Sequence, residues 1–126
     1  MRTLAWIAVG VALAIVAPAG CSSGCANRVT NRVSSPDGAR DAVVFTRDCG
    51  AGTTGSVQVE IVASGAVPED KPSSLFIIDH PVDTPGRVDA RWASSARLVV
   101  TYPPGARVVK QEASRGDVSI VYSATP

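Results

Sequence analysis

The sequence predicts an all-β fold: a single small antiparallel sandwich or barrel-like meander of seven to eight strands, following an N-terminal signal peptide. Three observations support this prediction. Short segments with alternating apolar and polar residues recur along the chain, Pro- and Gly-rich connections separate them, and no segment after residue 20 has sustained helical periodicity. The length of 126 residues leaves room for one such domain.

The clearest expected strand lies at residues 57–62. Val57, Val59 and Ile61 share one face of it, and Gln58 and Glu60 share the other. The expected strands cover residues 27–33, 42–47, 57–62, 75–79, 88–92, 98–102, 107–112 and 118–122. We expect the last two of these to form a hairpin across residues 114–117.

The first 20 residues have the pattern of a secretory signal peptide. Arg2 gives a positive start, and residues 4–17 (LAWIAVGVALAIVA) form an uncharged, mostly apolar run. As a helix this run spans roughly 21 Å, which is shorter than the ~30 Å hydrocarbon core of a bilayer. We therefore expect residues 1–20 to be removed on export. An uncleaved membrane anchor is the alternative.

Cys21 follows small residues in a segment that resembles a bacterial lipobox, although Pro18 replaces the usual aliphatic residue. The resemblance implies that Cys21 carries a lipid and becomes the new N-terminus. Residues 21–26 (CSSGCA) are then a lipidated cysteine and short tether, and residues 27–126 are the β domain. Cleavage without lipidation, which leaves a periplasmic protein, is the alternative.

The residue after the lipid-bearing cysteine bears on location. In the lipoproteins that this segment resembles, Asp at that position is associated with retention at the inner membrane, and this chain has Ser22. The resemblance therefore implies a lipoprotein that faces the periplasm, at the outer membrane rather than the inner one. The membrane is then a partner of the protein through the lipid on Cys21.

The chain has three cysteines: Cys21, Cys25 and Cys49. If Cys21 carries lipid, an even pair remains, and an exported protein meets an oxidising compartment. We therefore expect a Cys25–Cys49 disulfide, with two free thiols as the alternative. A metal site at the cysteines is disfavoured, because no CxxC pattern is present.

Short segments between residues 25 and 59 follow the pattern SPDG…AVVF.RDCGATTG…QV, with Gly52 as an extra residue. This pattern resembles a family of small exported bacterial proteins of uncharacterised function. The resemblance implies paired cysteines and no known activity. The matching segments are Cys25 and residues 35–38, 42–45, 47–51, 53–55 and 58–59.

Two loops hold candidate ligand residues. In the glycine-rich loop after Cys49, exposed backbone N–H groups together with Arg47, Thr53 and Thr54 could hold an anion. The alternative is a strand connection held by the disulfide.

The second loop contains Asp79, His80 and Asp83. Its two carboxylates and imidazole could bind a divalent ion, and His80 could act as a general base. The alternative is an ordinary solvated loop.

Composition excludes several classes of function. A net charge of +1 and an aromatic content of 5% disfavour nucleic-acid binding, and a single histidine excludes sites that need two. No cofactor fingerprint or nucleophile motif is present, so we expect no cofactor and no catalysis.

We therefore expect a non-catalytic envelope lipoprotein that acts as a binding or structural module, with an envelope protein as its possible partner. One alternative is a small lipoprotein enzyme inhibitor, similar to lysozyme inhibitors in size and anchor only. The other is a metal-binding or enzymatic module around Asp79, His80 and Asp83.

Overall fold

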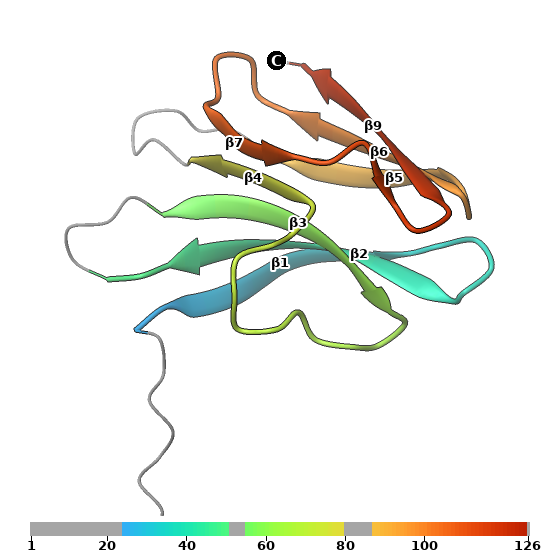
Figure 1. Ribbon diagram of the computed structural model, residues 1–126, viewed down its shortest axis with the longest axis horizontal. Helices are drawn as coiled ribbons and strands as arrows, with labels where there is room; N and C mark the ends of the chain where they lie inside the picture. Colours follow the sequence, from blue (N-terminus) through green and yellow to red (C-terminus); the bar gives the residue numbers. More distant parts are fainter. Residues whose placement is uncertain (1–23, 51–54, 80–86, 126) are drawn as a thin grey trace, which may run out of the picture.

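The computed structural model describes residues 24–50, 55–79 and 87–125, and these form two β-sheets packed face to face (Figure 1). The strands are β1 (Ala26–Ser34), β2 (Arg40–Asp48), β3 (Ser56–Ala63), β4 (Phe76–Asp79), β5 (Asp89–Ser94), β6 (Arg97–Tyr102), β7 (Val108–Gln111), β8 (Ser114–Arg115) and β9 (Val118–Ala124). The first sheet has the order β1-β2-β3-β4-β7 and the second the order β5-β6-β9-β8. The predicted all-β sandwich is confirmed. The described residues form nine strands, because the turn before β9 includes the two-residue strand β8.

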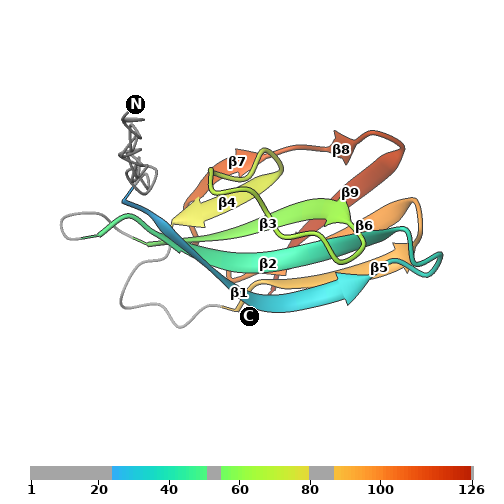
Figure 2. The same cartoon turned by 90° about the horizontal axis from the view of Figure 1, so that it is seen from below.

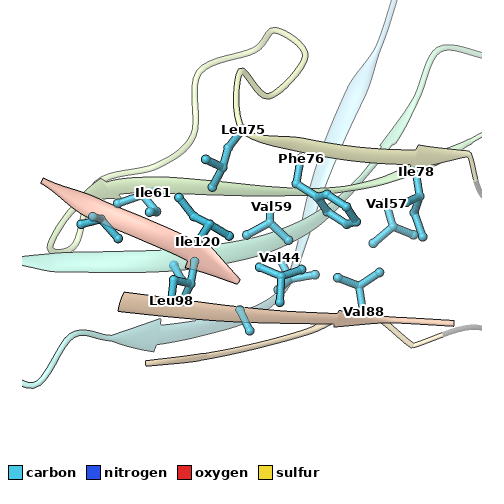
Figure 3. Packing of buried hydrophobic residues seen from close by; sticks show 14 residues of the cluster. Val44, Val57, Val59, Ile61, Leu75, Phe76, Ile78, Val88, Leu98 and Ile120 are labelled. Carbon is cyan, nitrogen blue, oxygen red and sulfur yellow. The ribbon is translucent and has the colours of Figure 1, made fainter. Parts of the chain in front are cut away.

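Apolar side chains from both sheets meet in the middle of the sandwich (Figure 3). Val57, Val59 and Ile61 of β3 point into this core, as their alternation predicts, and they face Leu98 and Ile120 of the second sheet. Burial of each such side chain contributes about 1.5–3 kcal/mol, so this shared core holds the two sheets together.

The predicted hairpin between residues 107–112 and 118–122 is wrong. β7 pairs with β4 in the first sheet, whereas β9 lies in the second sheet and runs parallel to β6. The tight turn exists, with Gly116 at a φ of 58°, but it joins β9 to the short strand β8. Local alternation identifies strands and turns, but the choice of sheet depends on distant contacts, here those of Val108 with β4 and Ile120 with the core.

The edges of both sheets are poor templates for an added strand. Register shifts interrupt β1 between Val29 and Asn31, β5 between Trp92 and Ser94, and the β4–β7 pair beside Val109. The fourth edge strand in the described residues, β8, has only two residues. Bulges and short edges hinder pairing with another chain, so partner binding by strand addition is disfavoured.

A disulfide joins Cys25 and Cys49 beside the open end of the β1–β2 pair. The antiparallel register pairs Ala26 with Asp48, and one further step places the two cysteines opposite each other. The predicted disulfide is therefore confirmed. Cys21 lies outside the described residues, and within those residues no helix is long and apolar enough to cross a membrane.

Replacing both cysteines in a Cys25→Ala/Cys49→Ala variant should destabilise the domain. The bond joins residues 24 positions apart, and closing a loop of that size destabilises the unfolded chain by roughly 3.5 kcal/mol. We expect the Tm, measured by circular dichroism, to fall by about 10 °C or more. An unchanged Tm would contradict a stabilising role for the bond.

Candidate functional site

Strand β2 is buried on both faces. Ala42 and Val44 point into the core between the sheets. Val43 and Phe45 share the opposite face, which is the outer face of the first sheet. Residues 64–74, which connect β3 to β4, lie across that face (Figures 1 and 2). The outward side chains of β2, with exposed fractions of at most 6%, are Asp41, Val43, Phe45 and Arg47.

The first anchor of this connection is Asp41, which is buried at one end of β2. Its Oδ2 accepts hydrogen bonds from the Gly65 N–H at 2.9 Å and from Arg32 Nη1 at 2.7 Å, and its Oδ1 accepts one from Ser34 at 2.8 Å. Arg32 also donates to the carbonyl of Ala66. The Gly65 N–H, followed by Arg32 and Ser34, lowers the pKa of Asp41 to about 2.

The second anchor is Arg47, which is buried near the other end of β2. Its Nη1 donates to Asp70 at 2.8 Å and to Asn27 Oδ1 at 2.7 Å. Asn27 in turn donates to the carbonyl of Glu69. A buried guanidinium needs such partners, and Arg47, a candidate anion ligand in the sequence, here holds the connection. Thr53 and Thr54, its expected co-ligands, lie outside the described residues.

The third anchor is Ser73, which is buried beside β3. Its backbone N–H donates to Gln58 Oε1 at 2.6 Å, and its hydroxyl donates to the carbonyl of Val59 at 2.5 Å. The same hydroxyl accepts a hydrogen bond from the N–H of Leu75. Within the described residues, no buried side-chain nitrogen or oxygen lacks a partner. The connection is therefore fixed at its start, middle and end.

A partly open cavity of about 310 Å³ lies where the connection meets the sheet. This volume is at the lower end of the roughly 300–1,000 Å³ typical of small-molecule sites. Phe45 lies against it from β2, and Arg115 reaches it from β8 of the other sheet. The remaining lining comes from residues 60–63, 66–69 and 71–74. The cavity thus combines three distant parts of the chain.

The residues of two ion pairs line this cavity. Arg115 Nη1 donates to Glu60 Oε1 at 2.6 Å, and its Nη2 donates to the hydroxyl of Ser74. Lys71 pairs with Glu69 at 2.7 Å, which lowers the pKa of Glu69 and raises the pKa of Lys71. The Glu60 side chain is 14% exposed, whereas Lys71 and Glu69 are 65% and 74% exposed. The Arg115–Glu60 pair is therefore the less screened of the two.

Asp79, from the second predicted ligand loop, lies at the end of β4 and pairs with Arg107 at 3.4 Å. His80 and Asp83 lie outside the described residues. In the part of the chain that the structure describes, no three His, Cys, Asp or Glu side chains are grouped to hold a metal ion. The site around Asp79, His80 and Asp83 stays a prediction.

Comparisons of the chain with protein-family models, curated proteins and solved structures find no match. The candidate site therefore rests on its geometry. The resemblance to a family of exported bacterial proteins stays a prediction.

Acid should remove the contribution of Asp41 to stability. Its folded-state pKa of about 2 is below the ordinary value of 3.8, so its contribution is full above pH 3.8 and disappears as the pH falls through 2. We expect Asp41→Asn to lower the free energy of unfolding, measured in urea at pH 7. The difference in this free energy between the variant and the native chain should shrink between pH 4 and pH 2. Asp117→Asn, at an exposed pair with Arg40, should have little effect at any pH. A difference for Asp41→Asn that does not change with pH would refute this assignment.

Removing the carboxylate of Asp70 should destabilise the fold more than removing a carboxylate whose partner is exposed, because Asp70 pairs with the buried Arg47. We expect Asp70→Ala to lower the free energy of unfolding by about 1–3 kcal/mol. In a double-mutant cycle, Arg47→Met should recover part of that loss. Glu69→Ala, at an exposed pair, is the control and should cost less than 1 kcal/mol or so. If the changes in the free energy of unfolding caused by the Arg47 and Asp70 variants simply add in the double variant, the two residues do not interact and the proposed anchor is wrong.

Proposed function

We propose that this chain is a non-catalytic binding module of the bacterial cell envelope, exported by residues 1–20 and held at the membrane by a lipid on Cys21. One observation carries the proposal. The Cys25–Cys49 disulfide begins four residues after Cys21, and such bonds form and persist in oxidising compartments outside the cytoplasm. The chain has three cysteines, and the disulfide joins the two that would not carry the lipid.

The tether to the membrane is short in this proposal. β1 begins at Ala26, so residues 22–25 separate Cys21 from the first strand. At about 3.3–3.6 Å per residue, five steps of chain span at most roughly 18 Å. The disulfide end of the sandwich therefore stays close to the bilayer.

The preformed cavity favours binding as the role of the domain. Three buried anchors fix residues 64–74 before any ligand arrives. A site that is already ordered loses less conformational entropy on binding, which favours affinity. The bulged sheet edges leave the cavity as the better candidate for recognition.

The intact mass of the protein extracted from membranes tests the anchor. We expect a chain that begins at Cys21 and carries a lipid, and we expect Cys21→Ser to leave the membrane fraction or to remain uncleaved. The Cys25→Ala/Cys49→Ala variant is the matched control and should keep its lipid. A product that retains residues 1–20, or that begins elsewhere without lipid, would contradict the proposal.

A further inference from the structure

The cavity beneath residues 64–74 has apolar walls and two cations among its lining residues. Its apolar side chains come from Phe45, Val62, Ala66, Val67, Pro68 and Pro72. The cations are Lys71 and Arg115. An apolar pocket with a few convergent polar groups is the usual form of a small-molecule site.

Both cations have hydrogen-bond donors to spare. A guanidinium has five N–H donors, and within the described residues Arg115 uses one for Glu60 and one for Ser74. An ammonium group has three donors, and Lys71 has one described partner, Glu69, at 2.7 Å. The remaining donors can serve an acceptor that enters the cavity.

The two carboxylates near these cations differ in how firmly they are held. Glu60 accepts from Arg115, from the Ile61 N–H at 3.1 Å and from the Ser74 N–H at 3.0 Å, so donors surround its charge. Glu69 is exposed, and an exposed ion pair contributes only about 0–1 kcal/mol. An incoming anion can therefore replace Glu69 beside Lys71 at small cost.

We propose that the cavity binds the carboxylate form of a medium-chain fatty acid. The acyl chain lies against Phe45 and the apolar wall, and the carboxylate accepts hydrogen bonds from Lys71 and Arg115. An acid is favoured over an alcohol or an amine because both spare-donor side chains are cations. This ligand class rests on the proposed function, in which the domain binds a ligand near a bilayer that is a source of acyl chains.

Titration of the processed Cys21→Ser chain with octanoate tests the proposal. The disulfide of this chain is verified first, and binding is followed by ¹⁵N NMR. We expect saturable shifts confined to the cavity, centred on the backbone amides of residues 66, 67, 69–71, 73 and 74, since Pro68 and Pro72 have no N–H. Octanol, which has the same chain length and no charge, should bind at least tenfold more weakly. Lys71→Gln and Arg115→Gln should each weaken octanoate binding about tenfold and so reduce the preference for octanoate over octanol.

Lys110→Gln is the matched control, because Lys110 lies on β7 and does not line the cavity. It should leave octanoate binding unchanged. Ala66→Phe, which fills the cavity, should abolish binding of both probes, and Val62→Phe replaces it if that variant does not fold. Equal affinity for octanoate and octanol, equal effects of Lys71→Gln and Lys110→Gln, or a preference for a peptide with a free C-terminal leucine would overturn the proposal.

The two proposals can fail separately. The octanoate titration uses a chain without lipid, so a missing lipid on Cys21 would overturn the anchor and leave the titration result unchanged. Absence of octanoate binding to a protein whose lipid has been found by mass would overturn the ligand class alone.

Discussion

The need to cover the outer face of β2 determines the form of the candidate site. Val43 and Phe45 are apolar and face away from the sandwich core, and leaving them in water would forfeit about 1.5–3 kcal/mol each. Asp41 and Arg47 flank them on the same face, and charges cannot be buried without partners. Residues 64–74 satisfy both requirements, because they cover the apolar pair and supply partners to the two charges. The cavity is the space that remains beneath a cover fixed by its anchors.

The strands were largely predictable because their signal is local. Alternation over residues 57–62 predicts β3 and its inward face, and the apolar run at residues 42–45 predicts β2. Alternation does not say whether the outer face of a strand meets water or another segment. β2 has apolar residues on both faces, which fits either an outer face in water or one covered by another segment. Only the position of residues 64–74 in the structure shows that both faces are buried. The wrong hairpin at residues 107–122 has the same origin, because sheet membership is decided by contacts far away in sequence.

The candidate site was hardly predictable. Its contacts join Asn27 with Glu69, 42 positions apart, and Glu60 with Arg115, 55 positions apart, and no local pattern links such residues. Arg47 is a candidate ligand by sequence, but a sequence alone does not distinguish a guanidinium that binds a ligand from one that a carboxylate or amide of the same chain already holds. One local signal was available, since Asp41 and Arg47 flank an apolar run on the same face of one strand. Such charges predict a covering segment that supplies hydrogen-bond partners to them.

The disulfide and the cavity belong to one continuous set of contacts. Cys25 and Asn27 are two residues apart on β1 and its approach, and Cys49 and Arg47 are two residues apart at the end of β2, so each pair shares a face. The register places Asn27 opposite Arg47, and together they hold residues 69 and 70. The next residue along the connection lines the cavity. Oxidation of the two cysteines therefore restrains the strand ends that position one wall of the cavity.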